Sequence, residues 1–141
     1  MCGSGMNSEN SEIIQEIGLD EMKKNFFLLD HRKDLSLIYS ALDAHILTSL
    51  SESSSNSVME SLSCGTICLS TDVGNSSELL DDKYIFKSND IKALTNALSL
   101  LINNPNKNVS YSDNLRRNIE SKFSIEKMNT EYIDFYKGII N

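Results

Sequence analysis

The sequence predicts an α/β fold, a Rossmann-like parallel sheet with flanking helices, formed by one domain of residues 1–141. Short apolar runs alternate with segments of helical periodicity, which is the pattern of parallel strands joined by crossover helices. The chain has 141 residues, of which 40% are hydrophobic and 23% charged. Those values are ordinary for a soluble globular domain with a single core.

Apolar periodicity and stop signals predict the helices, and short apolar runs predict the strands. The expected strands are Asn25–Leu29, Ala44–Thr48, Thr66–Ser70 and Tyr84–Phe86. The expected helices are 9–17, one from Asp34 to Leu42, one ending at Cys64-Gly65, a short one within 72–80, then 90–103, 110–122 and 125–138. In helix 90–103 the stripe expected to face inward is Ile91, Leu94, Leu98, Leu101 and Ile102. Residues 1–8 are expected to be poorly ordered, and 110–141 to form the C-terminal helices.

Composition excludes several classes of protein. A formal net charge of −7 argues against binding to nucleic acid or anionic lipid, because both require Lys and Arg to neutralise phosphates. No apolar run is long enough to span a bilayer, and residues 1–12 lack the features of a secretory signal. Three cysteines and two histidines match no metal signature. Reduced thiols in a cytoplasmic protein are the simplest interpretation.

A Ser-rich stretch at 49–57 lies between a strand end and a helix start, where ligands bind in open α/β sheets. Glu52 lies in this loop, and Glu60 follows in the helix with seven residues between them. The helix N-terminus offers free N–H groups and a positive dipole end, which suit a diphosphate. Carboxylates accept hydrogen bonds from sugar hydroxyls. Two carboxylates beside such a phosphate cradle could therefore accept hydrogen bonds from the hydroxyls of a sugar.

Each of these signals also has a purely structural interpretation. Ser57 and Glu60 have the spacing of a capping box, in which the Glu60 carboxylate would accept the Ser57 N–H. Glu52 alone could be a solvated loop charge, and the serines alone a flexible loop. The residues taken singly leave both interpretations open.

The order of segments resembles the C-terminal, nucleotide-sugar-binding domain of the family-4 retaining glycosyltransferases (glycosyl transferases group 1). The resemblance covers 25–140 and is carried by NFFLLDHRKDL, LIYSALDAHILTSLSE, SVMESLSCGTICLSTDVGNSSELL and KSNDIKALTNALSLLINNP. Its strongest element is the glutamate pair placed before the Cys64-Gly65 turn. The resemblance implies the C-terminal half of a GT-B fold, truncated at its N-terminal side.

The resemblance also implies roles for individual residues. Glu52 would be the catalytic candidate, touching the donor sugar near the reacting centre, and Glu60 would hold the ribose hydroxyls. The other substrate-binding candidates are Ser54, Ser55, Asn56, Ser57 and Val58 at the helix start, Arg32 and Lys33 beside the nucleobase, and Gly74 and Glu78 across the crevice. The alternatives are a solvated surface for the Arg32-Lys33 pair and a helix-start residue, stabilised by the dipole, for Glu78.

Two departures from the family pattern stand out. Ser53-Ser54-Ser55 replaces a segment close to Gly-Phe-Gly, keeping the backbone donors but losing the conformational freedom of glycine. The family's basic pair, which neutralises the leaving diphosphate, and its acceptor-binding domain would both precede residue 1. The chain alone is therefore expected to be incomplete and inactive.

The expected function is transfer of a sugar, with retention, from a nucleotide diphosphate donor to an acceptor. By resemblance, the donor would be a UDP-sugar, no metal or other cofactor would be required, and the setting would be bacterial surface polysaccharide (capsule) biosynthesis. The protein would be cytoplasmic, touching the inner face of the membrane through the absent half.

Two other functions remain open from the sequence. The chain could be a non-catalytic nucleotide-sugar-binding or interaction module that works with a partner chain. Apolar residues of 123–140 would then dock on an N-terminal acceptor domain, a partner chain or a second copy. A flavodoxin-like or receiver-type α/β domain shares the alternation of strands and helices. The receiver type would need an acidic cluster after its first strand, and the start MCGSG has none.

Overall fold

The computed structural model describes residues 1–140, except the side chains of Leu19, Met22 and 105–110. The chain divides into two compact units, Met1–Leu35 and Ser36–Asn141. The expectation of a single domain stays a prediction, and each unit is described by itself.

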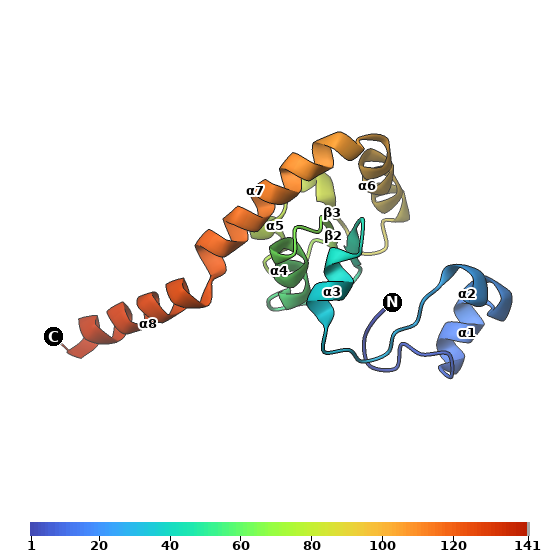
Figure 1. Ribbon diagram of the computed structural model, residues 1–141, viewed down its shortest axis with the longest axis horizontal. Helices are drawn as coiled ribbons and strands as arrows, with labels where there is room; N and C mark the ends of the chain where they lie inside the picture. Colours follow the sequence, from blue (N-terminus) through green and yellow to red (C-terminus); the bar gives the residue numbers. More distant parts are fainter. Residues whose placement is uncertain (141) are drawn as a thin grey trace. The chain divides into compact units, whose positions relative to one another are not determined.

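The first unit contains helices α1 (Ser11–Ile17) and α2 (Leu19–Asn25), drawn in blue in Figure 1. The side chain of Asn10 caps α1 by accepting the N–H groups of Glu12 and Ile13, and Gly18 ends the helix as the sequence predicts. Helix α2 was not expected. It has acidic residues in its first turn and lysines in its last, and the helix dipole interacts favourably with both groups of charges.

The predicted strand at 25–29 is wrong. Asn25 ends α2, and 26–30 run as irregular chain. A strand needs a neighbouring strand to take its hydrogen bonds, but this segment bonds to the start of the chain. The N–H of Leu29 donates to Met1 O at 2.9 Å, and the N–H of Gly3 donates to Asp30 O at 2.9 Å. Residues 1–8 therefore have defined bonding partners, while their expected poor order stays a prediction.

The second unit is built around a parallel sheet with strand order β1-β2-β3. The strands are β1 (His45–Leu47), β2 (Cys68–Thr71) and β3 (Ile85–Phe86), each within or one residue beyond an expected strand. Helix α3 (Leu35–Ser40) precedes β1, and between the strands lie α4 (Asn56–Ser63), α5 (Ser76–Leu79) and a 3-10 turn at Asp82–Tyr84. The helices α6 (Ile91–Asn103), α7 (Pro105–Phe123) and α8 (Ile125–Ile140) complete the unit. The predicted α/β class is confirmed.

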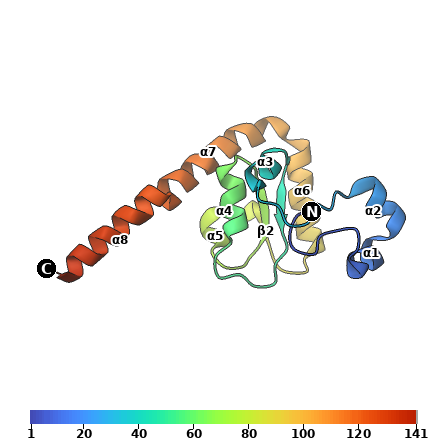
Figure 2. The ribbon, with the colours of Figure 1, turned by 60° about the horizontal axis from the view of Figure 1, so that its bottom comes forward.

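Helices cover the sheet through two apolar clusters. One joins α4, β2 and α7 through Val58, Leu62, Cys68, Leu115 and Ile119, and the other joins β2, β3 and α6. Helices α4 and α7 lie side by side in Figures 1 and 2. Helix α7 begins at Pro105 rather than near 110, because proline suits the first turn of a helix, where its missing N–H is not needed.

The stripe predicted for α6 is partly wrong. Leu101 is buried and Leu94 and Leu98 pack against the core, but Ile91 and Ile102 are 77% and 75% exposed. Ala97 is buried instead, because the inward face of the helix follows Leu94, Ala97, Leu98 and Leu101, and Ile91 and Ile102 lie to the side of that face. Among the helices of residues 1–140, none combines the length and the apolar character needed to cross a bilayer.

Candidate functional site

Two loops leave the sheet at the same edge of the second unit. One runs from the end of β1 to α4, and the other runs from the end of β2 to α5. Leu47 of β1 lies opposite Ser70 of β2 in parallel register. The carboxyl ends of parallel strands lie at one edge of the sheet, so these two loops are neighbours there. Open α/β sheets bind their ligands at this edge.

Three contacts join the two loops. The Thr71 hydroxyl donates to Ser49 O at 2.7 Å, and the Ser55 N–H donates to Asn75 Oδ1 at 3.1 Å. Gly74 has φ +57°, and a Cβ there would lie 3.2 Å from the carbonyl oxygens of Glu52 and Ser53. Only glycine suits both the dihedral and the space. The structure thus brings Gly74 beside Glu52, two residues that the sequence placed in one site.

Buried hydroxyl groups form hydrogen bonds within the second loop, which joins β2 to α5. The side chains of Ser70 and Ser76 lie 3.0 Å apart, and the Ser76 hydroxyl also lies 2.7 Å from Val73 O, which it can donate to. Both serines are fully buried. Because these bonds are shielded from water, they hold the turn before α5 in one conformation.

The two glutamates occupy different surroundings. Glu52 is half-buried, and its Oε1 accepts the Ser49 hydroxyl at 2.8 Å within the same loop. Glu60 is exposed on α4, and its Oε2 lies 3.4 Å from the Tyr39 hydroxyl of α3, which donates to it. The carboxylate of Glu52 is therefore oriented by its loop, and that of Glu60 by a neighbouring helix.

The capping-box interpretation of Ser57 and Glu60 is wrong. Helix α4 begins at Asn56 with Ser55 at the N-cap position, so Ser57 already lies inside the first turn. The N–H of Val58 donates to Ser55 O at 3.0 Å, which tightens that turn. The carboxylate of Glu60 meets Tyr39 instead, because the helix starts earlier than the spacing suggested.

Protein acceptors already take several of the N–H groups expected to meet a ligand. Ser55 donates to Asn75, Asn56 donates to Ser54 O at 3.1 Å, and Val58 donates to Ser55 O. Within the described residues, the N–H groups of Ser54 and Ser57 donate to no protein acceptor. These two remain available to an anion at the positive end of α4.

Ser55 is buried, with 1% of its surface exposed. Its hydroxyl has no hydrogen-bond partner among the described atoms. Buried polar groups are nearly always bonded, and leaving one unbonded costs about 1–3 kcal/mol. The orphaned hydroxyl lies at the N-cap of α4, the same place where the N–H groups of Ser54 and Ser57 are free.

Behind the site, His45 Nδ1 lies 3.2 Å from Ser61 Oγ and 3.3 Å from Cys68 Sγ. Burial lowers the pKa of His45 and raises the pKa of Cys68 to about 12. Both groups are therefore neutral near pH 7, so the pair is not a thiolate–imidazolium nucleophile. Its role is to pack β1 against β2 and α4.

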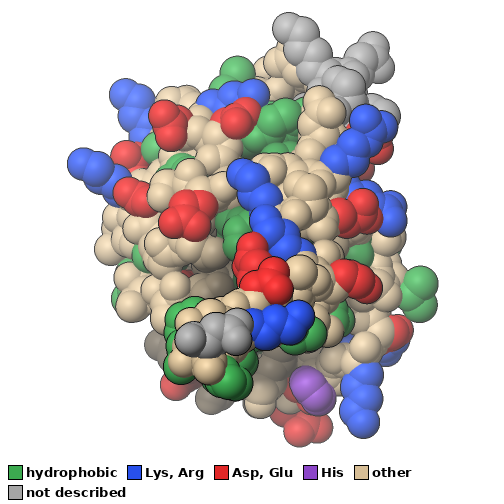
Figure 3. Space-filling model, turned by 90° about the vertical axis from the view of Figure 1, so that its left-hand side faces the viewer, with side chains coloured by type: hydrophobic (Ala, Val, Ile, Leu, Met, Phe, Trp, Pro, Cys, Tyr) green, Lys and Arg blue, Asp and Glu red, His purple; other side chains and the backbone are tan. Residues whose placement is uncertain are grey.

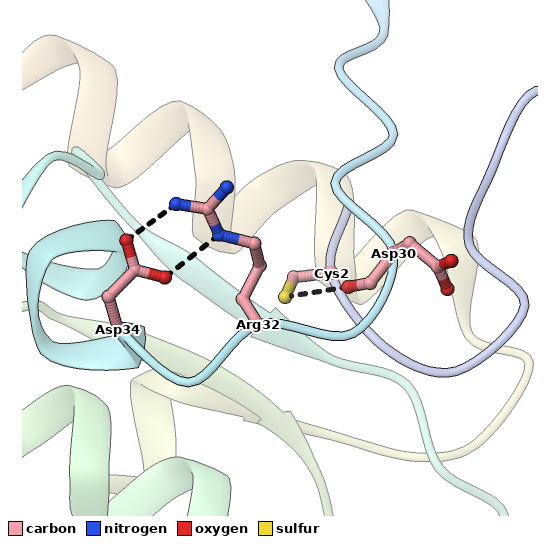
Figure 4. A network of polar contacts seen from close by, with 4 residues as sticks. All are labelled: Cys2, Asp30, Arg32 and Asp34. Atoms are coloured by element: carbon pink, nitrogen blue, oxygen red, sulfur yellow. Dashed lines mark hydrogen bonds and ion pairs between the residues drawn. The ribbon is translucent and has the colours of Figure 1, made fainter.

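Arg32 and Lys33 belong to the first unit. Arg32 Nε donates to Asp34 Oδ1 at 2.8 Å, and this bond lowers the pKa of Asp34 (Figure 4). Cys2 Sγ donates to the nearby Asp30 O at 3.2 Å. Both Arg32 and Lys33 are exposed. Their place beside a nucleobase stays a prediction.

Glu78 is exposed in the first turn of the four-residue helix α5, the position expected of a carboxylate stabilised by the dipole. Its place across the crevice stays a prediction. Sequence reasoning did not single out Ser49, Thr71 or Asn75, which join the loops. An asparagine after Val73-Gly74 was the one available signal, because Asn side chains commonly bond backbone groups in turns.

No group of three or more His, Cys, Asp or Glu side chains able to hold a metal ion occurs within the described part of the chain. The expectation that no metal is required stays a prediction.

Comparison with known proteins assigns this chain to a family. The family model for glycosyl transferases group 1 matches residues 1–118. A glycogen synthase of Thermodesulfovibrio yellowstonii is 28% identical over 137 residues, which are 95% of this chain and 25% of that protein. The UDP-Gal:alpha-D-GlcNAc-diphosphoundecaprenol alpha-1,3-galactosyltransferase of Escherichia coli is 30% identical over 122 residues, 84% of this chain and 31% of that protein.

Solved structures show the same fold. HepE from Anabaena in complex with UDP superposes with a TM-score of 0.87 at 18% identity, over 97% of this chain and 40% of that one. Its complex with UDP-glucose gives a TM-score of 0.81 at 17% identity, with the same coverage. The fold is that of half of a GT-B glycosyltransferase, and the receiver-type alternative is wrong.

Proposed function

The chain belongs to the glycosyl transferases group 1 family, and from this premise we propose that it is the donor-binding part of a retaining, family-4 enzyme. The whole protein transfers a sugar from a nucleotide diphosphate to an acceptor in bacterial surface polysaccharide biosynthesis. The name of the Escherichia coli relative supports an acceptor that is a sugar carried on diphosphoundecaprenol. The HepE complexes with UDP and UDP-glucose support a UDP-sugar donor.

The chain spans about a quarter to a third of the length of the curated relatives it matches. Catalysis, the acceptor and a cytoplasmic location at the membrane face therefore belong to the proposal for the whole protein. The basic pair and the acceptor-binding domain are contributed from outside residues 1–141.

One observation carries the proposal: the joined loops place Glu52, Gly74 and the start of α4 together at the carboxyl edge of the sheet. The diphosphate binds at the N-terminus of α4, where the N–H groups of Ser54 and Ser57 are free. Glu52 accepts a hydroxyl of the donor sugar, and Glu60 accepts the ribose hydroxyls.

This arrangement assists departure of the diphosphate. During transfer, the bond between the anomeric carbon and the phosphate oxygen breaks, and the diphosphate leaves with the electron pair. A new bond forms to the acceptor oxygen, which loses its proton. Negative charge grows on the diphosphate, and fixed N–H dipoles at a helix end stabilise it without reorganisation. No metal is part of the proposed mechanism.

The test is titration of the purified chain with UDP, GDP and UDP-glucose, by calorimetry and by ¹⁵N NMR. We expect binding of UDP, with amide shifts at 52–60. Glu60→Ala should weaken binding about 10- to 100-fold, because each hydrogen bond to a charged group contributes about 1.5–3 kcal/mol. Glu126→Ala, an exposed glutamate on α8, is the matched control and should bind UDP normally.

Two outcomes would contradict the donor site. One is a wild-type chain that binds neither nucleotide. The other is Glu60→Ala binding UDP as tightly as wild type. Tyr39→Phe refines the result, because it removes the hydroxyl that donates to Glu60 while the carboxylate remains.

The exposed apolar face of α8 favours a second candidate, a non-catalytic module that serves a partner chain. A cavity of about 710 Å³ lies among α4, α7 and α8, lined by Met59, Lys122, Phe123, Met128, Glu131, Tyr132 and Phe135. Figure 3 faces the C-terminal end of α8, where hydrophobic and charged side chains lie next to each other. Such a face suits an acceptor domain, a partner chain or a second copy.

Joining the chain to an acceptor-binding domain that carries a basic pair separates the two candidates. Sugar transfer by the joined protein would support the enzyme. Donor binding without any transfer would support the module.

A further inference from the structure

The amide of Asn75 lies at the N-terminal end of α4, although Asn75 belongs to the loop before α5. We propose that Asn75 is a further donor-binding residue: its oxygen fixes the start of α4, and its nitrogen donates a hydrogen bond to the diphosphate. The proposal rests on the proposed function, because it assumes that a nucleotide diphosphate binds there.

The hydrogen bond to Ser55 identifies which side-chain atom of Asn75 is the oxygen and which is the nitrogen. Asn75 Oδ1 accepts the Ser55 N–H at 3.1 Å, and only the oxygen of an amide can accept. Nδ2 is bonded to the same carbon as this oxygen, so it lies at the same helix end. Within the described chain Nδ2 donates to no protein acceptor, and it is not buried. It is therefore a free donor that solvent, or a ligand, can reach.

Charge composition explains why a neutral donor is needed here. Residues 34–82, which include both loops and all of α4, contain no Lys or Arg. An anion at this edge must therefore be held by neutral groups from this stretch. The available ones are the N–H groups of Ser54 and Ser57, the orphaned hydroxyl of Ser55 and the amide nitrogen of Asn75.

The Asn75 amide is also held rigidly before any ligand arrives. Gly74 packs against the backbone of Glu52 and Ser53, and the buried hydroxyl of Ser76 is bonded within the same turn. A donor held in place loses little conformational freedom when it binds, which strengthens the hydrogen bond it makes.

Two substitutions separate the functions of the two amide atoms. Asn75→Asp keeps an oxygen for the Ser55 N–H but replaces the nitrogen donor with a second carboxylate oxygen. Asn75→Ala removes both atoms. Asn96→Asp makes the same charge change at an exposed position on α6 and is the control.

The measurements are affinities for UDP and for uridine, together with the ¹⁵N-¹H signal of Ser55. Asn75→Asp should keep the Ser55 N–H hydrogen-bonded, with its proton signal still downfield, and should leave uridine binding unchanged. Its affinity for UDP should fall about tenfold or more, because a donor is lost and an anion gained. Asn75→Ala should shift the Ser55 signal and lower UDP affinity by a smaller factor. Asn96→Asp should match wild type.

The outcomes distinguish this proposal from the donor site itself. A wild-type chain that binds no UDP overturns both. Normal UDP binding by Asn75→Asp, or equal losses of UDP and uridine affinity, overturns the role of Asn75 and leaves the donor site standing. If Asn75→Asp does not fold, Asn75→Ala decides, since undiminished UDP affinity in that variant also overturns the role.

Discussion

Gly74→Ala tests whether the two loops press on each other as closely as the structure shows. The substitution forces an L side chain into φ +57° and places its Cβ 3.2 Å from the carbonyl oxygens of Glu52 and Ser53. The left-handed dihedral costs about 1–2 kcal/mol for a residue other than glycine. Crowding of a well-packed region adds about 1–3 kcal/mol, because the opposing atoms are backbone and cannot rotate away.

Two other glycines separate these contributions. Gly65 has φ +77°, and an added Cβ meets nothing within 4 Å, so Gly65→Ala measures the dihedral cost alone. It ends α4 in a Schellman motif, in which the Thr66 N–H donates to Ser61 O at 2.9 Å. Gly138 lies in α8 with no neighbour within 4 Å and no left-handed dihedral. Gly138→Ala should therefore stabilise the helix, by up to about 1 kcal/mol.

The assay is urea unfolding of the three variants beside wild type, followed by circular dichroism. We expect Gly74→Ala to lower the free energy of unfolding by about 2–4 kcal/mol, and Gly65→Ala by about half as much. The loss of chain entropy in the unfolded state is common to all three changes, so it cancels in the difference. The Glu52 and Ser53 amide signals should shift in Gly74→Ala alone.

Equal losses in Gly74→Ala and Gly65→Ala would refute the reasoning. That result would mean that the backbone of Glu52 and Ser53 does not press on Gly74. The two loops would then not be packed together at Gly74.

Three further predictions concern Ser55, His45 and Cys68. Ser55→Ala removes the orphaned hydroxyl, so the free energy of unfolding in urea should not fall, while the affinity for UDP should drop. A loss of stability above about 1 kcal/mol would mean that the hydroxyl is bonded. Burial lowers the folded pKa of His45 below 6.5. The unfolded chain therefore takes the proton first, so stability is full above pH 6.5 and is lost as pH falls through the interval down to the folded pKa. Urea unfolding at pH 7.5 and 5.5 should show a smaller loss in His45→Gln, and an identical loss would contradict it. The pKa of Cys68 is raised to about 12, so its buried thiol should resist Ellman's reagent at pH 8, while the exposed Cys2 reacts. Rapid labelling of Cys68 in the folded chain would count against its burial.

Elements whose signals are local were predicted well from the sequence. Gly18 and Gly65 end α1 and α4 as expected, since a left-handed residue after a helix is a property of a few neighbouring residues. The parallel strands were expected from short apolar runs, and the central strand β2 is buried on both faces in the structure. The Asn25–Leu29 strand failed, because an apolar run becomes a strand only where another strand pairs with it.

The candidate site shows the same division. Glu52 and Glu60 could be placed at the end of a strand and in the following helix from their spacing and the family pattern alone. Their roles as ligands stay predictions. The capping box failed because it required Ser57 to be the N-cap of α4, whereas Ser55 takes that position and its N–H is bonded to Asn75 of the second loop.

The sequence by itself determined the alternation of strands and helices, the glutamate pair before a Cys-Gly turn, and hence the class of fold and the family. Only the tertiary structure decided which residues hold the site together. Asn75 and Ser55 are 20 residues apart in the chain, and Thr71 and Ser49 are 22 apart. Their contacts arise because two parallel strands end at one edge, a relation between segments that no local pattern of residues contains.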